Sequence, residues 1–270
     1  MSKNSIGVLG CGWLGLPLAK TLLSKGYSVS GTTTSPEKME ELRALGISPF
    51  QINLSPNAIE GDIKEFLSKL DVLIINVPPK LRGTQRESYV DKMQLLLTEI
   101  EASHLSKIVF VSSTAVYGDA EGEVTEATIP IPTTESGKQL LVCEQLFQNT
   151  SDLKTTIIRF GGLIGPKRHP ITMLSGRQNL SNGNAPINLI HLNDCIKMII
   201  TIIEKDYWDE TFNGVYPLHP TKREYYTSEA KKRNLEPPHY SSETDNASGK
   251  MVLSQNYLDK GHAFTANIHS

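Results

Sequence analysis

Short apolar runs alternate with helix-like segments through the first part of the chain. The runs are rich in β-branched residues and cover residues 5–9, 27–33, 50–54, 72–77, 107–112 and 155–160. Segments with helical spacing of apolar residues lie between most of them, at 14–24, 36–45, 63–70, 89–102 and 137–148. This alternation predicts right-handed crossovers and a parallel sheet covered by helices on both faces.

A glycine-rich turn joins the first run to the first helical segment. It reads Gly10-Cys11-Gly12-Trp13-Leu14-Gly15 and has the spacing GxGxxG. The first glycine permits a tight turn, the second lets a pyrophosphate approach the backbone, and the third lets the helix pack closely on the strand. The NH groups at the helix start then face the phosphates. Within a βαβ unit this turn predicts a bound dinucleotide, held by Gly10, Gly12, Trp13, Leu14 and Gly15.

The fold class that we predict is α/β, a Rossmann-type doubly wound parallel sheet with a small C-terminal lobe. The alternation ends near Phe160, and residues 161–184 are rich in Gly, Pro, Arg and Asn. We therefore place an NAD(P)-binding Rossmann domain at residues 1–165 and a smaller substrate lobe, not independently folding, at 166–270.

The end of the second strand indicates which dinucleotide is bound. An NAD site usually has Asp or Glu there, whereas this chain has Thr32, Thr33, Thr34 and Ser35. No acid repels a 2'-phosphate at that tip, and Lys38 could donate to one, so NADP is favoured over NAD. The alternative is that Ser35 merely caps the next helix, with Pro36 at its start. Val77 and Pro78, at the end of the run 72–77, complete the candidate cofactor residues.

Composition narrows the class of protein. Lys+Arg 27 against Asp+Glu 29 gives a formal charge of -2, so no bulk charge favours nucleic acid or an anionic membrane. The sequence has no apolar span of membrane length and no signal-peptide pattern, which predicts a cytoplasmic protein. Its three cysteines, Cys11, Cys143 and Cys195, show no metal-site spacing, and we expect them to be core residues and the chain to hold no metal.

Three further segments carry a family resemblance. Residues 111–118 read VSSTAVYG, residues 159–166 read RFGGLIGP, and residues 188–194 read NLIHLND. In this order they resemble the extended short-chain dehydrogenases, the NAD-dependent epimerase/dehydratase family, over about residues 5–200. The resemblance implies that Ser113, four residues before Tyr117, hydrogen-bonds the reacting hydroxyl or carbonyl.

The chain departs from the family at its catalytic pair. The family's YxxxK tyrosine and lysine correspond to Ser136 and Leu140. A serine hydroxyl is too weak an acid to replace a phenol near neutral pH. The pattern resembles the atypical branch of the superfamily that lacks the pair. Tyr117 and Lys138 remain as alternative sources of a proton or a charge, although the family's second tyrosine is usually structural.

Other polar residues have both a functional and a structural interpretation. His191 and Asp194 lie where the family joins its cofactor core to its substrate lobe, and a capped turn explains them equally well. Thr221 and Glu224 have capping-box spacing and predict a helix running to about Arg233. We expect its basic residues to form a solvated face, with an anionic substrate as the alternative; they are Lys222, Arg223, Lys231, Lys232 and Arg233.

The leading functional hypothesis is an NAD(P)-dependent oxidoreductase or epimerase-like protein that transfers a hydride to or from a small carbonyl or sugar-like substrate. The alternative is a non-catalytic NAD(P)-binding sensor, which the missing pair supports. Residues 10–19 also resemble the opening of UDP-sugar dehydrogenases, but the catalytic cysteine context and the chain length of those enzymes are absent. The segment 89–102 could form a homodimer, or its apolar face could pack entirely on the sheet.

Overall fold

A computed structural model describes residues 4–79, 87–241 and 249–269 of the chain. The chain forms two compact units, and each unit is assembled from separate segments of the sequence. Unit 1 comprises Met1–Ser113, Thr134–Ile158 and Ile196–Thr211. Unit 2 comprises Thr114–Thr133, Arg159–Cys195 and Phe212–Ser270. The boundary at residue 165 stays a prediction.

A seven-stranded sheet organises the fold, with strand order β12-β9-β7-β6-β1-β2-β3. The pairings from β7 through β3 are parallel. The strands are β1 (Ser5–Leu9), β2 (Ser28–Thr33), β3 (Ser48–Gln51), β6 (Val72–Ile75), β7 (Lys107–Ser113), β9 (Lys154–Phe160) and β12 (Thr211–Gly214). The predicted Rossmann-type fold is confirmed.

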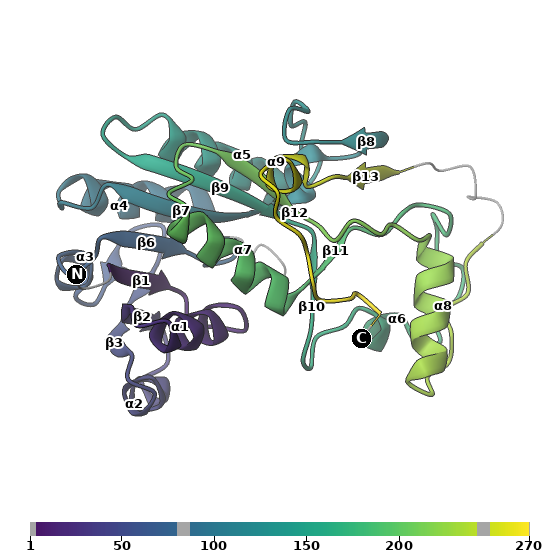
Figure 1. The fold of residues 1–270 in the computed structure, drawn as a ribbon, viewed down its shortest axis with the longest axis horizontal. Helices are drawn as coiled ribbons and strands as arrows, with labels where there is room; N and C mark the ends of the chain where they lie inside the picture. The colour runs from purple at the N-terminus through teal and green to yellow at the C-terminus, as the bar shows by residue number, and fades with distance from the viewer. Residues whose placement is uncertain (1–3, 80–86, 242–248, 270) are drawn as a thin grey trace. The chain divides into compact units, whose positions relative to one another are not determined.

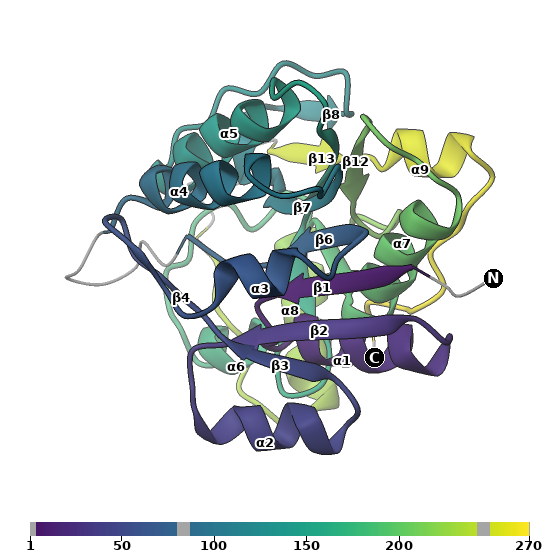
Figure 2. The ribbon, with the colours of Figure 1, turned by 90° about the vertical axis from the view of Figure 1, so that its left-hand side faces the viewer.

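The order of the strands fixes where a ligand can meet the sheet. The chain runs outward from β1 to β2 and β3 and then returns to β6 on the other side of β1, as Figure 2 shows. The crevice beyond the carboxyl ends of β1 and β6 is therefore a topological switch point, where ligands bind in open α/β sheets.

Helices cover the sheet at nearly the predicted positions. In unit 1, α4 and α5 lie side by side (Figure 2). The helices outside unit 2 are α1 (Gly15–Ser24), α2 (Glu37–Ala44), α3 (Ile63–Leu67), α4 (Tyr89–Glu101), α5 (Glu135–Gln148) and most of α7 (Leu192–Glu204). No helical range was predicted for α7, which carries the buried Cys195. Strands β4 (Asn53–Leu54) and β5 (Ile59–Glu60) form a small hairpin.

Unit 2 is built from short elements. Two parallel strand pairs, β10 (Gly162–Ile164) with β11 (Leu189–His191) and β8 (Gly122–Val124) with β13 (Lys250–Val252), are visible in Figure 1. Its helices are η1 (Thr114–Tyr117), α6 (Ile171–Leu174), α8 (Lys222–Lys232) and α9 (Gln255–Asp259). The predicted capping box of Thr221 and Glu224 is confirmed at the start of α8.

Buried apolar side chains account for this architecture. All four residues of β6 are 0% exposed, as a strand covered on both faces requires. A separate core in unit 2 packs Ile164 and Ile171 against Tyr225 of α8. The three cysteines are buried, as predicted. No helix among the described residues is long and apolar enough to cross a membrane.

Candidate functional site

The three glycines of the turn differ in the space that a side chain would find at each of them. Gly10 has φ +104°, and a Cβ there would lie 2.8 Å from the carbonyl oxygen of Asn76. A Cβ on Gly15 would lie 2.1 Å from the carbonyl oxygen of Gly10, so α1 can start only if this residue has no side chain. A Cβ on Gly12 would meet no atom within 4 Å. The turn therefore needs glycine at Gly10 and Gly15 for packing and leaves open space at Gly12.

The start of α1 suits an anion. Its cap residue Leu14 makes no side-chain cap hydrogen bond, and the first turn contains no acid. The positive end of the helix dipole is therefore not offset by a carboxylate from that turn. The open space at Gly12 and this helix start together fit a pyrophosphate group.

Asn76, which the sequence analysis did not single out, holds the turn in place. It follows β6, and its Nδ2 donates to the carbonyl oxygen of Gly10 at 3.2 Å. Its backbone NH donates to Leu9 at 3.0 Å. Its neighbour Val77 lies against the same glycine, since a Cβ on Gly10 would come within 3.1 Å of Val77 Cγ1. Val77 is thus beside the glycine turn, whereas Pro78 is exposed.

The threonines at the end of β2 differ in their availability. Thr32 is 3% exposed, and its Oγ1 accepts from the backbone NH of Gly10 at 2.9 Å, so it secures the turn. Thr33 Oγ1 accepts from the NH of Ser35 at 3.1 Å. Thr34 is exposed. The hydroxyl of Ser35 donates to the Glu37 carboxylate, which lowers the pKa of Glu37.

Tyr89 connects the segment after β6 to the helices of unit 1. Its hydroxyl donates to the carbonyl oxygen of Val77 at 2.8 Å, and its backbone NH donates to Gln139 Oε1 at 2.7 Å. The side chain is 1% exposed, and burial raises its pKa well above the usual value. Tyr89 is a fixed support of the Val77 backbone rather than an acid.

Ser113 is the last residue of β7 and is half-buried at the carboxyl edge of the sheet. Its neighbour Ser112 points elsewhere, because the Ser112 hydroxyl donates to Oε1 of Glu144, which is fully buried on α5. This bond gives Ser112 a structural role at the end of the strand. The two adjacent serines therefore have separate surroundings.

The positions of the family's catalytic pair lie on α5, which starts at Glu135 after the cap Thr134. The Thr134 hydroxyl accepts from the NH of Gly137 at 3.2 Å. Ser136 is half-buried, Leu140 is 4% exposed within the core, and Lys138 is exposed. Leu140 packs as an ordinary core residue in place of a lysine.

Tyr117 belongs to a buried polar network in unit 2. Its hydroxyl donates to Asn213 Oδ1 at 2.9 Å and accepts from Arg159 Nη1 at 2.9 Å. The side chain is 1% exposed, and burial raises its pKa while Arg159 opposes that rise. Nearby Glu126 accepts from the NH of Asn213 at 2.8 Å. The Tyr117 hydroxyl thus both donates a hydrogen bond to a protein group and accepts one from another.

Asp194 and His191 also bind protein groups. The Asp194 carboxylate accepts from the backbone NH of Thr265 at 2.9 Å and from that of Ala266 at 2.9 Å. His191 Nδ1 accepts from the NH of Asn193 at 3.2 Å. These contacts fit the structural interpretation, in which the two residues cap turns.

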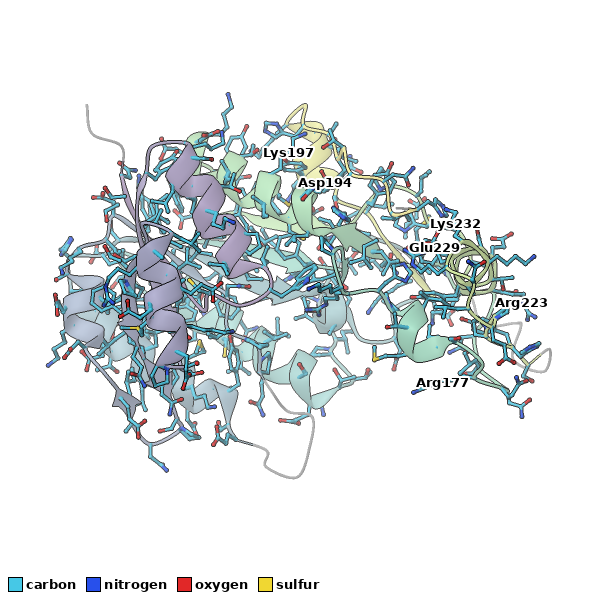
Figure 3. The ribbon with its side chains drawn as sticks, turned by 90° about the horizontal axis from the view of Figure 1, so that it is seen from below. Arg177, Asp194, Lys197, Arg223, Glu229 and Lys232 are labelled. Carbon is cyan, nitrogen blue, oxygen red and sulfur yellow. The ribbon has the colours of Figure 1, made fainter. Side chains whose placement is uncertain are left out.

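The basic end of α8 is exposed at Lys231 and Lys232, as expected of a solvated face, and it also pairs with a buried acid. Figure 3 shows Glu229 and Lys232 on this helix, and Lys232 Nζ lies 2.9 Å from the buried Glu229 carboxylate. Arg233 forms a second ion pair with Glu229, and His169 Nε2 lies 3.8 Å from it. Lys232 and Arg233 therefore compensate a buried acid, which sequence spacing alone did not reveal, although Lys232, like Lys231, is exposed.

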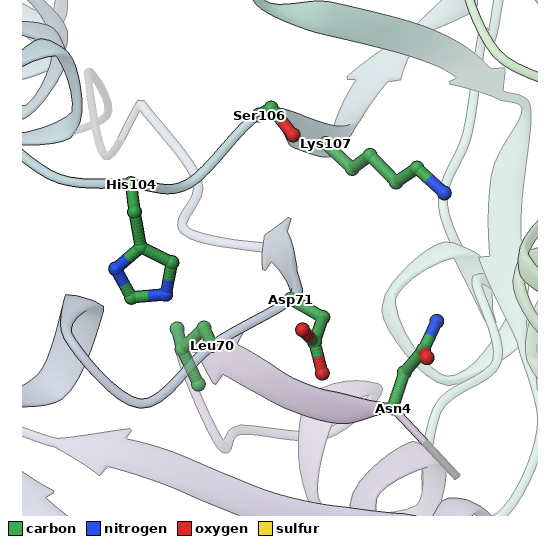
Figure 4. A pocket seen from close by; sticks show the side chains of 6 residues that line it. All are labelled: Asn4, Leu70, Asp71, His104, Ser106 and Lys107. Atoms are coloured by element: carbon green, nitrogen blue, oxygen red, sulfur yellow. The ribbon is translucent and has the colours of Figure 1, made fainter. Parts of the chain in front are cut away.

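A small polar pocket of unit 1 lies where the central strands of the sheet begin, opposite their carboxyl ends (Figure 4). Its lining residues precede or begin β1, β6 and β7, and they include Asn4, Asp71 and Lys107. The carboxyl ends of these strands, where Gly10, Val77 and Ser113 lie, are at the opposite edge. This pocket is separate from the candidate cofactor site.

Comparison with known proteins gives one family and several relatives. Residues 10–192 match the model of a family described as NAD(P)H-binding. Protein YeeZ of Escherichia coli (strain K12) is 33% identical over 250 residues, which cover 92% of this chain and 91% of YeeZ. The resemblance to the NAD-dependent epimerase/dehydratase family is confirmed.

Solved structures share the fold at low sequence identity. MoeE5 in complex with UDP-glucuronic acid and NAD has a TM-score of 0.79 and 20% identity, over 98% of this chain and 95% of that one. UDP-glucuronic acid 4-epimerase from Bacillus cereus, solved with UDP-glucuronic acid and NAD, has a TM-score of 0.79, 19% identity and the same coverages. At these identities the likeness concerns the fold.

Proposed function

The chain belongs to the NAD(P)H-binding family, and we propose that it is an oxidoreductase or epimerase-like enzyme acting by hydride transfer on a carbonyl or hydroxyl of a sugar-like substrate. The observation that carries the proposal is the open space at Gly12 beside a helix start without an acid. Proteins of the same fold that bind UDP-sugars and NAD support a nucleotide sugar as the substrate class.

The residues of this chain have distinct roles in the proposed reaction. The NH groups at the start of α1 bind the pyrophosphate, and Asn76 keeps the turn in the required conformation. A nicotinamide cofactor, when bound, supplies or accepts the hydride. Ser113 donates a hydrogen bond to the substrate oxygen and orients it. Tyr117 keeps the structural role that its bonds to Arg159 and Asn213 give it.

We further propose a preference for NADP over NAD. Thr34 and Lys38 are exposed, and either could donate to a 2'-phosphate. Glu37 works against this preference, because its bond to Ser35 places a carboxylate beside the same segment. The preference is therefore expected to be modest. A homodimer formed through α4 and a cytoplasmic location stay predictions.

Hydride transfer can be tested with purified protein, using NADPH with a panel of small carbonyl compounds and NADP⁺ with a panel of UDP-sugars, whose hydroxyl groups can only be oxidised. We expect oxidation of NADPH with a carbonyl compound, or either reduction of NADP⁺ or an epimerised product with a UDP-sugar. Replacing Ser113 by Ala should lower the rate at least about tenfold, because the substrate oxygen loses its hydrogen-bond donor. Turnover that is unchanged in Ser113→Ala would remove Ser113 from the mechanism.

The second candidate function is a sensor that binds NAD(P) without turnover. It is favoured by Leu140, which is buried in the core at the position of the family's lysine. Tight NADPH binding, measured by titration calorimetry, without any redox change of the cofactor and without any epimerised product in the panel would support the sensor over the enzyme.

A further inference from the structure

Lys250 joins the two ends of the helix η1 within unit 2. Its ammonium Nζ donates to the carbonyl oxygen of Thr114 at 3.0 Å and to that of Gly118 at 2.6 Å. Thr114 is the first residue of η1, and Gly118 directly follows its last. Hydrogen bonds from an ionised donor are stronger than neutral ones. One charged group thus fixes the whole turn.

The backbone of Lys250 is itself held from two sides. Lys250 begins β13 and pairs with Gly122 of β8. The side chain of Asn188 donates to the Lys250 carbonyl oxygen at 2.8 Å and accepts from the NH of Val252 at 2.7 Å. The lysine backbone is therefore anchored by residues from two separate stretches of sequence, at Gly122 and at Asn188.

The charge of Lys250 is not neutralised by a direct ion pair. Across residues 4–79, 87–241 and 249–269, no carboxylate oxygen lies within 4.0 Å of this Nζ. The side chain is half-buried, and burial lowers the pKa of Lys250 while the more distant charge of Asp119 opposes that change. Backbone carbonyl oxygens, rather than a carboxylate, therefore hold this ammonium.

The turn that Lys250 fixes begins one residue after Ser113. On the basis of the proposed function, we propose that Lys250 is a positioning residue for Ser113, because it holds the turn that starts at the next residue. A hydrogen-bond donor stabilises the substrate oxygen best when its position is fixed before the reaction. Lys250 acts through the backbone of Thr114, and no proton transfer is assigned to it.

Hydrogen exchange tests the positioning role without any substrate. In Lys250→Met, amides of residues 113–119 should exchange at least about tenfold faster than in the wild type, because two charged hydrogen bonds are lost. Lys250→Arg should restore slow exchange, since a guanidinium can donate to both carbonyls. The matched control is Lys231→Met, an exposed lysine of unit 2. Exchange that is as slow in Lys250→Met as in the control would overturn the proposal.

Labelling of the wild-type protein decides the case if Lys250→Met does not fold. An amine-acylating reagent should modify Lys250 at least about tenfold more slowly than Lys231, because both the hydrogen bonds and partial burial protect its ammonium. Equal modification rates of the two lysines, measured by mass spectrometry, would contradict the proposal that the ammonium of Lys250 is held in place.

A double-mutant cycle links Lys250 to Ser113. If the lysine acts through Ser113, the rate losses of Lys250→Met and Ser113→Ala should be strongly non-additive, with the double variant close to Ser113→Ala alone. Fully multiplicative losses would overturn the positioning role. Absence of turnover in the wild type would instead reject the proposed function, while the exchange and labelling results still decide how Lys250 fixes the turn.

Discussion

The glycine turn and the start of α5 both correspond to family motifs, yet they have opposite outcomes. At the turn, Gly10 and Gly15 are required by contacts with backbone atoms, and Gly12 leaves space for a ligand. On α5, Leu140, which the family resemblance places at the position of the catalytic lysine, is 4% exposed and packs in the core. The glycine turn thus leaves room for a dinucleotide, whereas Leu140 contributes to the packing of the core.

The largest effect is expected from Gly15→Ala. The added Cβ would lie 2.1 Å from the carbonyl oxygen of Gly10, so the strand and helix must separate. We expect a loss of about 3 kcal/mol in the free energy of unfolding, together with loss of NADPH binding. Urea denaturation measures the first and calorimetric titration the second. A variant as stable as the wild type would contradict the close packing at this glycine.

Leu140→Ala should also destabilise the fold but leave the cofactor site intact. Removing a buried leucine side chain typically costs about 2 to 5 kcal/mol, and we expect a value near the lower end. Affinity for NADPH should be unchanged. Val142→Ala on the same helix is the control, because Val142 is 46% exposed and should lose less than about 1 kcal/mol. If Leu140→Ala weakened NADPH binding without a loss of stability, the position would belong to the site after all.

Gly12→Val should show the reverse pattern. A Cβ at Gly12 meets no atom within 4 Å, so the free energy of unfolding should change little. The side chain would occupy the space that we assign to the pyrophosphate, and the Kd for NADPH should rise at least about tenfold, which corresponds to about 1.4 kcal/mol. Gly12→Ala should fall between this variant and the wild type. Unchanged affinity in Gly12→Val would place the pyrophosphate elsewhere.

The smallest effect is expected from Glu37→Gln. The bond from Ser35 lowers the pKa of Glu37, so this exposed carboxylate is charged at neutral pH. Its removal should improve affinity for NADPH relative to NADH by about threefold at low salt, and less at high salt because exposed charges are screened. Glu41→Gln, further along α2, serves as the control. A ratio that does not change would show that the 2'-phosphate does not lie beside Glu37.

Locally determined features could be predicted from the sequence. The alternation of strands and helices, the spacing of the three turn glycines and the capping box at Thr221 depend on residues within a few positions of each other. Short sequence patterns predict these features, because strand and helix periods and the steric limits of turns act over short stretches of chain. The Rossmann-type fold follows from such patterns, and element ends differ from the predicted ones by only a few residues.

Only the tertiary structure decided which polar side chains meet. Asn76 binds Gly10 across 66 positions, and Lys250 binds Thr114 across 136. Lys232 is exposed, as expected of a solvated face, yet it also pairs with the buried carboxylate of Glu229. The spacing of residues along the chain does not predict such pairs. Buried polar groups need hydrogen-bond or ion-pair partners, and these partners can come from any part of the sequence. The sequence by itself determined the sheet and its cofactor turn, and the fold decided which charges and hydroxyls are already engaged by protein groups.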